Sequence, residues 1–205
     1  MSKFSHADVK LISKTTLFQG FFKMVKYAFT HTKYDGSVSE VVEREVFERG
    51  HAVAVLAYDR KRDEFVLIEQ FRYPALETSS DPWMIEVIAG IIEEGEDEVD
   101  VCFREAKEEA GVELKNITKA MTYLSSPGGT TERLHIYMAE VDASTAKGIH
   151  GLDNEAEDIM VMRVKQSEAR EWLKNGKIDN AAAIIALQWF FLNKDELFLR
   201  WDAMN

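Results

Sequence analysis

Three carboxylates and one arginine in a short segment have the types and the spacing of a site for metal ions. Glu105, Glu108 and Glu109 are adjacent or three to four positions apart, so on a helix their carboxylates crowd onto one face, and Arg104 lies one turn before Glu108. Carboxylates placed this close repel one another unless they are well solvated or unless a hard divalent cation such as Mg²⁺ lies among their oxygens. The cluster therefore indicates either a solvated acidic surface or a metal site.

The segment that carries these charges has the pattern of an amphipathic helix. Its apolar residues recur every three or four positions and form one stripe: Val99, Phe103, Ala106 and Ala110. Gly111 follows the stripe and is the expected C-terminal end of the helix. A loop with two glycines, Gly90 and Gly95, leads into it. The charged side chains are thus predicted to lie on a helix that begins and ends in loops.

Residues 90–112 resemble the Nudix box of the Nudix hydrolases. Read as G-x5-E-x7-R-E-U-x-E-E-x-G-U, with U an apolar residue, the segment fills every fixed position, and Ala106 is a small occupant of the first U. The resemblance implies hydrolysis of a nucleoside diphosphate linked to another moiety, on a loop-helix-loop that holds metal. A merely solvated acidic helix would explain the charges, but not Gly90, Arg104 and Gly111 together.

Composition restricts the class of protein and its partners. The 205 residues are 46% hydrophobic and 30% charged, which is typical of a soluble globular protein. No apolar run approaches the ~20 residues of a membrane span, the N-terminus has no signal-like segment, and Cys102 is the single cysteine, so we expect a cytoplasmic protein with no membrane partner. The net charge of −11 and the scattered basic residues argue against nucleic acid as a partner. A phosphorylated small molecule remains compatible, because cations and a few arginines reverse the field locally.

Residues 1–49 are predicted to form a small antiparallel sheet. Alternating patterns indicate strands near residues 8–18, 21–31 and 41–46, and Asp35-Gly36 marks a hairpin turn between the last two. A sheet of this size is not stable alone. We therefore expect it to pack on the rest of the chain or on another subunit.

Residues 50–205 are predicted to form the main domain, an α/β (α+β) Nudix-type mixed sheet sandwiched between helices. Strands are expected at residues 51–58, 65–71, 83–90, 114–124, 134–141 and 159–164. Besides the helix at 99–110, we expect one capped by Ser167 that ends near Gly176, and one capped by Asp179-Asn180 that spans 181–192 and is buried nearly all round. The loop at 142–158 is long enough to be functional or mobile.

Features outside the box resemble the ADP-ribose pyrophosphatase branch of the Nudix hydrolases. Pro127 lies fifteen residues after Val112, where that branch carries a proline, and further similar segments are residues 44–50, 69–72, 148–151 and 177–182. The resemblance implies cleavage of ADP-ribose to AMP and ribose 5-phosphate with Mg²⁺ or Mn²⁺, by a homodimer with shared active sites. Two alternatives stay open: a hydrolase of GDP-mannose or other ADP-sugars, and a module that binds ADP-ribose without turnover. The intact carboxylates argue against the second.

The same resemblance implies roles for the charged residues. The metal ligands would be the side chains of Glu105, Glu109 and Glu157 and the carbonyl oxygen of Ala89. Arg104 would fix the carboxylates by ion pairing, and Glu108 would be a ligand or would orient one.

A catalytic base and substrate contacts complete the implied site. Glu155 would take the proton of the attacking water, with Glu108 the next candidate, although the acidic run at 155–158 is also compatible with a solvated loop. Residues implied to contact the substrate are Phe21, Arg44, Arg72, Pro127 and Glu132. Phe21 would stack on adenine from the neighbouring subunit, or else pack in a core, with Phe22 buried in its place if Phe21 is not.

Overall fold

The structure, a computed structural model, describes residues 3–204 and contains two compact units. Unit one comprises residues 3–51 and 124–133, and unit two comprises residues 52–123 and 134–204. Segment 124–133 joins unit one because it pairs with Phe47: the Phe47 N–H donates to the Gly129 carbonyl at 2.8 Å, and the Thr130 hydroxyl donates to the Phe47 carbonyl at 2.8 Å. A short 3-10 helix, η1 (His6–Asp8), precedes the first strand.

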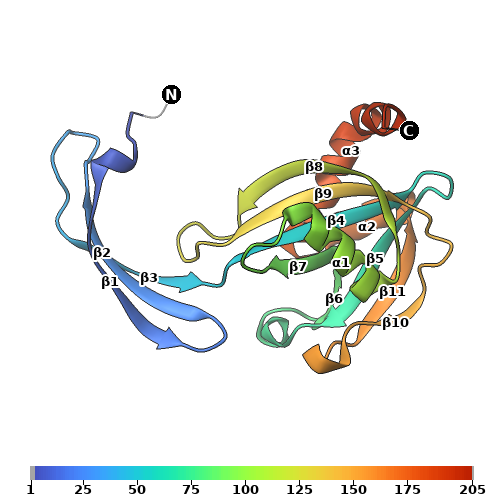
Figure 1. The fold of residues 1–205 in the computed structure, drawn as a ribbon, viewed down its shortest axis with the longest axis horizontal. Coiled ribbons are helices and arrows are strands. Elements are labelled where there is room, and N and C mark those ends of the chain that lie inside the picture. The colour runs from blue at the N-terminus through green and yellow to red at the C-terminus, as the bar shows by residue number, and fades with distance from the viewer. Residues whose placement is uncertain (1–2, 205) are drawn as a thin grey trace. The chain divides into compact units, whose positions relative to one another are not determined.

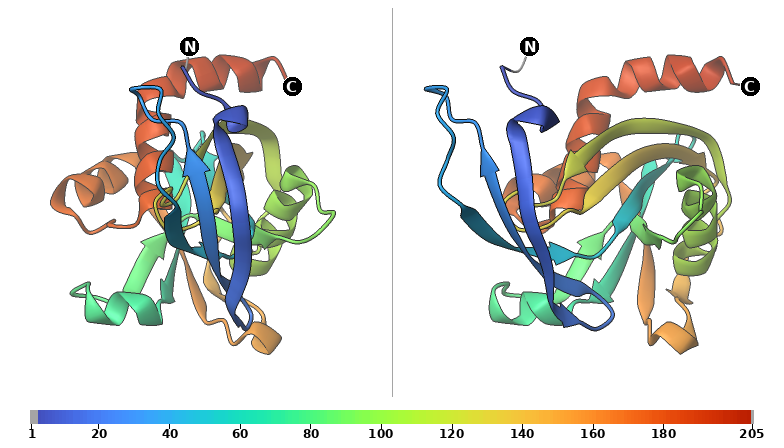
Figure 2. Two further views of the ribbon diagram at one scale, coloured as in Figure 1. Left: turned by 90° about the vertical axis from the view of Figure 1, so that its left-hand side faces the viewer. Right: turned by 60° about the vertical axis from the view of Figure 1, so that its left-hand side comes forward.

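Unit one is built on the three-stranded antiparallel sheet that the alternating patterns predict. Its strands are β1 (Val9–Gln19), β2 (Lys23–His31) and β3 (Val42–Glu48), in the order β1-β2-β3. The long strands β1 and β2, in blue, run side by side (Figures 1 and 2). Val25 and Ala28 are the buried residues of these strands, and every residue of β1 is exposed. Within one chain, this sheet buries very little apolar surface.

Unit two contains a mixed eight-stranded sheet, as predicted. Six strands follow the order β10-β11-β5-β4-β9-β8, while β6 pairs with β5 and β7 pairs with β4. The pairing of β4 with β9 is parallel, and that of β5 with β4, β6 and β11 is antiparallel. The strands are β4 (His51–Asp59), β5 (Glu64–Phe71), β6 (Trp83–Glu86), β7 (Ile88–Ile92), β8 (Leu114–Leu124), β9 (Arg133–Val141), β10 (Gly148–His150) and β11 (Ile159–Lys165).

Helices cover both faces of this sheet, because its central strands are apolar on both sides. The helices are α1 (Glu98–Ala110), α2 (Gln166–Asn175) and α3 (Ala181–Asp202). In β4, Val53 and Val55 pack in one core with Ala106 of α1, whereas Leu56 and Tyr58 pack in a second core on the α2 and α3 side. Figure 1 shows α1 in front of the sheet and α2 behind it. The expectation of helices on both faces is confirmed.

Several predicted element boundaries were wrong. The strand expected at 83–90 divides at Val87, since β6 pairs with β5 and β7 with β4. Helix α2 begins two residues earlier than a Ser167 cap requires, with Lys165 in the N-cap position. The loop expected at 142–158 holds β10 and the 3-10 helix η3 (Asp153–Glu155), and the polar loop after β5 holds η2 (Tyr73–Glu77).

The last helix starts where predicted but continues past its predicted end. The Asn180 side chain caps α3 by accepting the Ala183 N–H at 3.0 Å. The polar residues after Leu192 looked like an end of the helix, yet Leu197 and Trp201 continue its buried stripe. Leu192 itself is 84% exposed, so the helix is not buried all round. Among the residues described, no helix is long and apolar enough to cross a membrane.

Candidate active site

The charged cluster lies on α1, whose two ends are fixed by local contacts. At the N-terminus, the Asp97 side chain accepts the Val99 N–H at 2.8 Å. At the C-terminus, Gly111 adopts a left-handed conformation with φ of 62°, so the predicted stop is confirmed. A side chain at Gly111 would also overlap the ring of His150. Both effects favour glycine at this position.

Glu109 is a buried carboxylate at the centre of the cluster. Glu109 is only 3% exposed. Its Oε2 accepts a hydrogen bond from the Ala89 N–H at 2.9 Å. Burial raises the pKa of Glu109 to about 9, and the charges of Glu105 and Glu157 contribute to the increase. A buried carboxylate with so little compensation is destabilising unless a positive charge is supplied.

Glu105 lies beside Gly90, and the contact explains that glycine. A Cβ atom built on Gly90 would overlap the carboxyl group of Glu105, so only glycine leaves the space that this carboxylate occupies. Burial also raises the pKa of Glu105, to about 7, with Glu108 and Glu157 acting in the same direction and Arg104 opposing them. The loop before α1 and the carboxylates on it are thus one packed arrangement.

Arg104 holds three carboxylates of the box together. Its Nη1 lies 2.7 Å from Glu105 Oε1 and 3.2 Å from Glu108 Oε2, and its Nη2 lies 3.3 Å from Glu96 Oε2. Nη2 also donates to the Ile91 carbonyl at 3.4 Å. This geometry is what the role of orienting the carboxylates requires.

The acidic loop after β10 brings Glu157 to the cluster. The Gly151 N–H donates to the Glu108 carbonyl at 3.2 Å, and the Leu152 N–H donates to Glu157 Oε2 at 3.1 Å. The charge of Glu157 raises the pKa of both Glu105 and Glu109, so the three carboxylates are electrostatic neighbours.

Glu155 lies in the same loop but is arranged differently. It is exposed at the end of η3, and no hydrogen bond or ion pair of its side chain is found within residues 3–204. A carboxylate that is solvated and unattached is free to accept a proton from water.

Arg72 is the cation that the structure places near this cluster. It follows β5. Burial lowers the pKa of Arg72, but the ion pair with Glu86 raises it, so that the net shift is upward. The charges of Glu109 and Glu157 contribute smaller increases to this pKa. The Nη2 of Arg72 lies 2.8 Å from Glu86 Oε2. A guanidinium at this place suits a phosphate next to bound metal.

The donor atoms of the cluster fit a hard divalent cation. Every predicted ligand presents oxygen, which Mg²⁺ and Mn²⁺ prefer. Gly90 keeps a space for the Glu105 carboxylate, and the carboxylate of Glu109 is turned toward the backbone of Ala89, the fourth predicted ligand. Glu105 bonds to Arg104, and within residues 3–204 no three acidic, histidine or cysteine side chains converge closely enough to hold an ion. The predicted set of metal ligands stays a prediction.

The family model for the NUDIX domain matches residues 48–183, a segment that contains the whole helix, its carboxylates and the acidic loop. The chain belongs to the Nudix family. The resemblance of residues 90–112 to a Nudix box is thus confirmed. Hydrolases of this family depend on a divalent cation, in agreement with the oxygen donors of the cluster.

Similar proteins cover nearly the whole chain. It is 50% identical over 198 residues to the ADP-ribose pyrophosphatase of Escherichia coli (strain K12), covering 97% of this chain and 95% of that protein. It is 45% identical over 201 residues to the ADP-ribose pyrophosphatase of Haemophilus influenzae, covering 97% of this chain and 93% of that protein. It is 36% identical over 184 residues to the GDP-mannose pyrophosphatase of Cronobacter sakazakii, covering 88% of this chain and 94% of that protein. A crystal structure of an ADP compounds hydrolase, 18% identical, has the same Nudix fold with a TM-score of 0.70 over 92% of this chain and 96% of its own.

Four of the predicted substrate residues belong to unit one of this Nudix protein. Phe21 is 87% exposed and contacts Phe22 edge to face at 4.7 Å, so it does not pack in a core of this chain, and Phe22 is half-buried instead. Glu132 is buried and lies 3.1 Å from the Nε of Arg49. Arg44 and Pro127 are exposed. These substrate contacts stay predictions.

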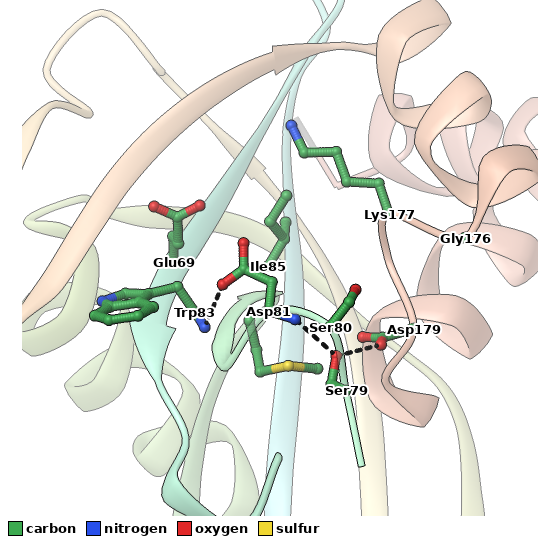
Figure 3. A pocket seen from close by; sticks show the side chains of 10 residues that line it. Glu69, Ser79, Ser80, Asp81, Trp83, Ile85, Gly176, Lys177 and Asp179 are labelled. Carbon is green, nitrogen blue, oxygen red and sulfur yellow. Dashed lines mark hydrogen bonds between the residues drawn. The ribbon is translucent and has the colours of Figure 1, made fainter. Parts of the chain in front are cut away.

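One pocket of unit two is lined by none of the carboxylates of α1 or of the acidic loop. It has a volume of about 240 Å³ and is bounded by residues from the loop before β6 and from the α2–α3 connection (Figure 3). In Figure 3, Ser79 links Asp179, at 3.3 Å, to the N–H of Asp81, at 3.4 Å. Glu69 and Ile85, which line it, lie on the sheet face that α3 covers, because Ile85 packs in the second core. Ser79, Asp81 and Asp179 are thus joined by hydrogen bonds within the protein.

Sequence reasoning missed two partners of the predicted residues. Glu86, which binds Arg72, and Arg49, which binds Glu132, were not proposed. The pairing of β6 with β5 brings Glu86 close to the end of β5, and the alternation of these strands is the signal that could have indicated it.

Replacing Gly90 with alanine should displace the Glu105 carboxylate and weaken metal binding. Because the added Cβ overlaps that group, we expect Gly90→Ala to raise the Mg²⁺ concentration for half-maximal rate by about tenfold or more. The matched control is Gly128→Ala, where an added Cβ meets nothing within 4 Å. Rate against Mg²⁺ concentration checks the prediction, and equal curves for the two variants would contradict it.

Proposed function

We propose that this chain hydrolyses ADP-ribose to AMP and ribose 5-phosphate with Mg²⁺, which Mn²⁺ is able to replace. The observation that most directly supports this proposal is the 50% identity to an ADP-ribose pyrophosphatase over nearly the full length of both chains. The intact set of Arg104, Glu105, Glu108 and Glu109 supports turnover rather than binding alone, since binding does not need every carboxylate.

The side chains of the cluster have distinct tasks in this reaction. Glu105, Glu109, Glu157 and the Ala89 carbonyl would hold a divalent cation, and such a cation would supply positive charge beside the diphosphate and make the attacking water more acidic. Arg72 donates hydrogen bonds to phosphate oxygens. Glu155 takes a proton from water as the water oxygen bonds to one phosphorus and the bridging P–O bond breaks. The bridging oxygen leaves with the other phosphate, so that AMP and ribose 5-phosphate form.

A second substrate class is supported by a specific relative. The 36% identity to a GDP-mannose pyrophosphatase makes another sugar nucleotide the alternative, because the box fixes the reaction and not the leaving group. Because this identity is lower than the 50% identity to an ADP-ribose pyrophosphatase, we propose GDP-mannose only as the second candidate substrate.

A product assay tests the proposal and its dependence on metal. We expect hydrolysis of ADP-ribose to exceed that of GDP-mannose, NADH and nucleoside triphosphates at equal concentration with Mg²⁺. Activity should be abolished by excess chelator and restored by Mg²⁺. Faster cleavage of GDP-mannose would reassign the substrate, and full activity of metal-stripped protein in chelator would remove the cation from the mechanism.

We also propose that two copies of the chain form a dimer through the sheet of unit one. The apolar side chains of β1 are exposed along both faces of the strand, for example Leu11 at 55%, Ile12 at 51% and Phe18 at 66%. A second copy would cover this surface and would bring Phe21 to the partner's substrate.

Truncation tests the dimer and the shared site together. A chain lacking residues 1–49 should sediment as a monomer and should have a higher KM for ADP-ribose, while the full chain sediments as a dimer. A truncated monomer that kept its KM would refute the shared site, and a monomeric full chain would refute the dimer. Circular dichroism of the truncated chain controls for folding.

A further inference from the structure

The segment Gly148-Ile-His-Gly151 leads from β10 into residues 152–158 of the acidic loop. β10 pairs with β11, and His150 is opposite Ile159 in this pairing. The chain therefore leaves the sheet at His150 and returns to it at Ile159, with Glu155 and Glu157 in between. The place of His150 fixes one end of the acidic loop.

The ring of His150 lies directly against the last glycine of the Nudix box. A Cβ atom built on Gly111 would overlap Cε1 of His150 and would lie 3.2 Å from its Nδ1. His150 Nε2 donates to the Lys147 carbonyl at 3.0 Å, because a carbonyl oxygen only accepts. The half-buried ring is thus fixed by the backbone of its own segment while it packs on the C-terminal end of α1.

The next residue attaches the loop to the same end of the helix. The Gly151 N–H donates to the Glu108 carbonyl at 3.2 Å, and carbonyls in the last turn of a helix have no partner within the helix. Gly151 has a φ of 102°, and a Cβ atom there would lie 2.6 Å from the Cβ of Glu157. Only glycine lets the start of the loop pass so close to Glu157.

Residues 152–157 are joined to one another by hydrogen bonds. The N–H groups of Glu155 and Glu157 donate to the Leu152 carbonyl at 2.9 and 3.3 Å, and the Leu152 N–H donates to Glu157 Oε2 at 3.1 Å. Both glutamates are therefore held relative to Leu152. A shift of the attachment at His150 and Gly151 would move both of them relative to α1.

We propose that His150 is a positioning residue whose ring, packed on Gly111, holds the acidic loop with Glu155 and Glu157 against the C-terminal end of α1. The consequence for metal binding and proton transfer rests on the proposed function. Gly111 then has two tasks, to end the helix and to leave space for the ring. The alternative is that its φ of 62° alone requires glycine and that the ring only fills space beside it.

Amide hydrogen exchange of the metal-free full chain tests the positioning without turnover. The Gly151 N–H reports the contact with α1, and that of Val55, buried in β4, reports global unfolding. His150→Ala should speed exchange at Gly151 by about tenfold and leave Val55 unchanged. His150→Phe, which keeps a planar ring against Gly111, should restore most of the protection. Unchanged exchange at Gly151 in His150→Ala, equal acceleration at Val55, or no restoration by His150→Phe would overturn the proposal.

Two glycine variants separate the ring contact from backbone strain. Gly111 and Gly176 both end helices in the left-handed conformation, with φ of 62° and 77°, but an added Cβ at Gly176 meets nothing within 4 Å. Gly111→Ala should speed exchange at Gly151, and the matched control Gly176→Ala should not. The double variant Gly111→Ala, His150→Ala should exchange no faster than the faster single variant, because both changes act through one contact. Strain acts whether or not the ring is present, so multiplied effects in the double variant would overturn the proposal.

Titration of Mg²⁺ alone, by calorimetry, connects the positioning to the proposed function. His150→Ala should weaken Mg²⁺ binding by about tenfold, the usual effect of losing a group that orients metal ligands, and Gly176→Ala should bind Mg²⁺ normally. Faster exchange at Gly151 with unchanged Mg²⁺ affinity would leave the positioning role standing and refute Glu157 as a ligand. Weaker Mg²⁺ binding with unchanged exchange would overturn the positioning role. If the unmodified chain binds no Mg²⁺, the metal site is refuted, and the exchange result alone decides the role of His150.

Discussion

Glu109→Gln should lower kcat for ADP-ribose by about 10²–10³-fold, the size of losing one preorganised electrostatic contact to the transition state. The substitution keeps the shape of the side chain, and the amide oxygen is still able to accept the Ala89 N–H that Glu109 Oε2 accepts at 2.9 Å. Only the negative charge that faces the cation is lost. The rate at saturating Mg²⁺ is the measurement.

The stability of the metal-free protein should not fall together with activity in this variant. Glu109 is buried, and burial opposes its charged form, so a neutral amide of equal size should not lower the unfolding temperature of the metal-free protein. The control is Glu113→Gln, which removes one charge from an exposed side chain just after the box and should leave kcat unchanged. Near-normal turnover of Glu109→Gln would mean that the carboxylates form only a solvated surface. A large fall in its unfolding temperature would mean that packing, not charge, explains the loss.

The features that sequence predicted best are those that depend on neighbours along the chain. The spacing from Gly90 to Val112 predicted α1, its end at Gly111 and the carboxylate face, because helical periodicity and the left-handed end are local properties. The same applies to the start of α3, where one side chain, that of Asn180, caps the helix.

Contacts between distant segments could not be predicted in this way. The bond from the Ala89 N–H to Glu109 and the approach of Glu157 depend on how β7 and the acidic loop lie against α1. The end of α3 was wrong for a similar reason, since Trp201 is held by the core and by a bond to Thr118 at 3.1 Å, neither of which periodicity reveals. Glu86 was missed because strand pairing, not sequence spacing, brings it to Arg72.

Replacing Glu155 and replacing Glu157, the two glutamates of the acidic loop, should have different effects on the reaction. Glu157 accepts a hydrogen bond from the Leu152 N–H and acts electrostatically on Glu105 and Glu109, as we expect of the metal ligand that we propose it to be. Glu155 is exposed and makes no side-chain hydrogen bond or ion pair within residues 3–204, so its carboxylate is available to accept a proton from water. Losing a ligand weakens metal affinity, whereas losing a base slows proton transfer with metal and substrate still bound.

Glu155→Gln should therefore bind Mg²⁺ and ADP-ribose almost normally while its kcat falls by about 10²–10⁴-fold, the usual contribution of a positioned base. The deficit should shrink as pH rises, because hydroxide replaces the missing proton acceptor. Glu157→Gln should instead need more Mg²⁺ for half-maximal rate, and each variant is thus the control for the other. The measurement is kcat against pH and against Mg²⁺ concentration for both. If added Mg²⁺ rescues Glu155→Gln, or if that variant is as active as the unmodified chain, the base lies elsewhere. Glu108 is the next candidate. Its carboxylate lies 3.2 Å from Arg104 Nη1, so it would have to leave that ion pair in order to accept the proton.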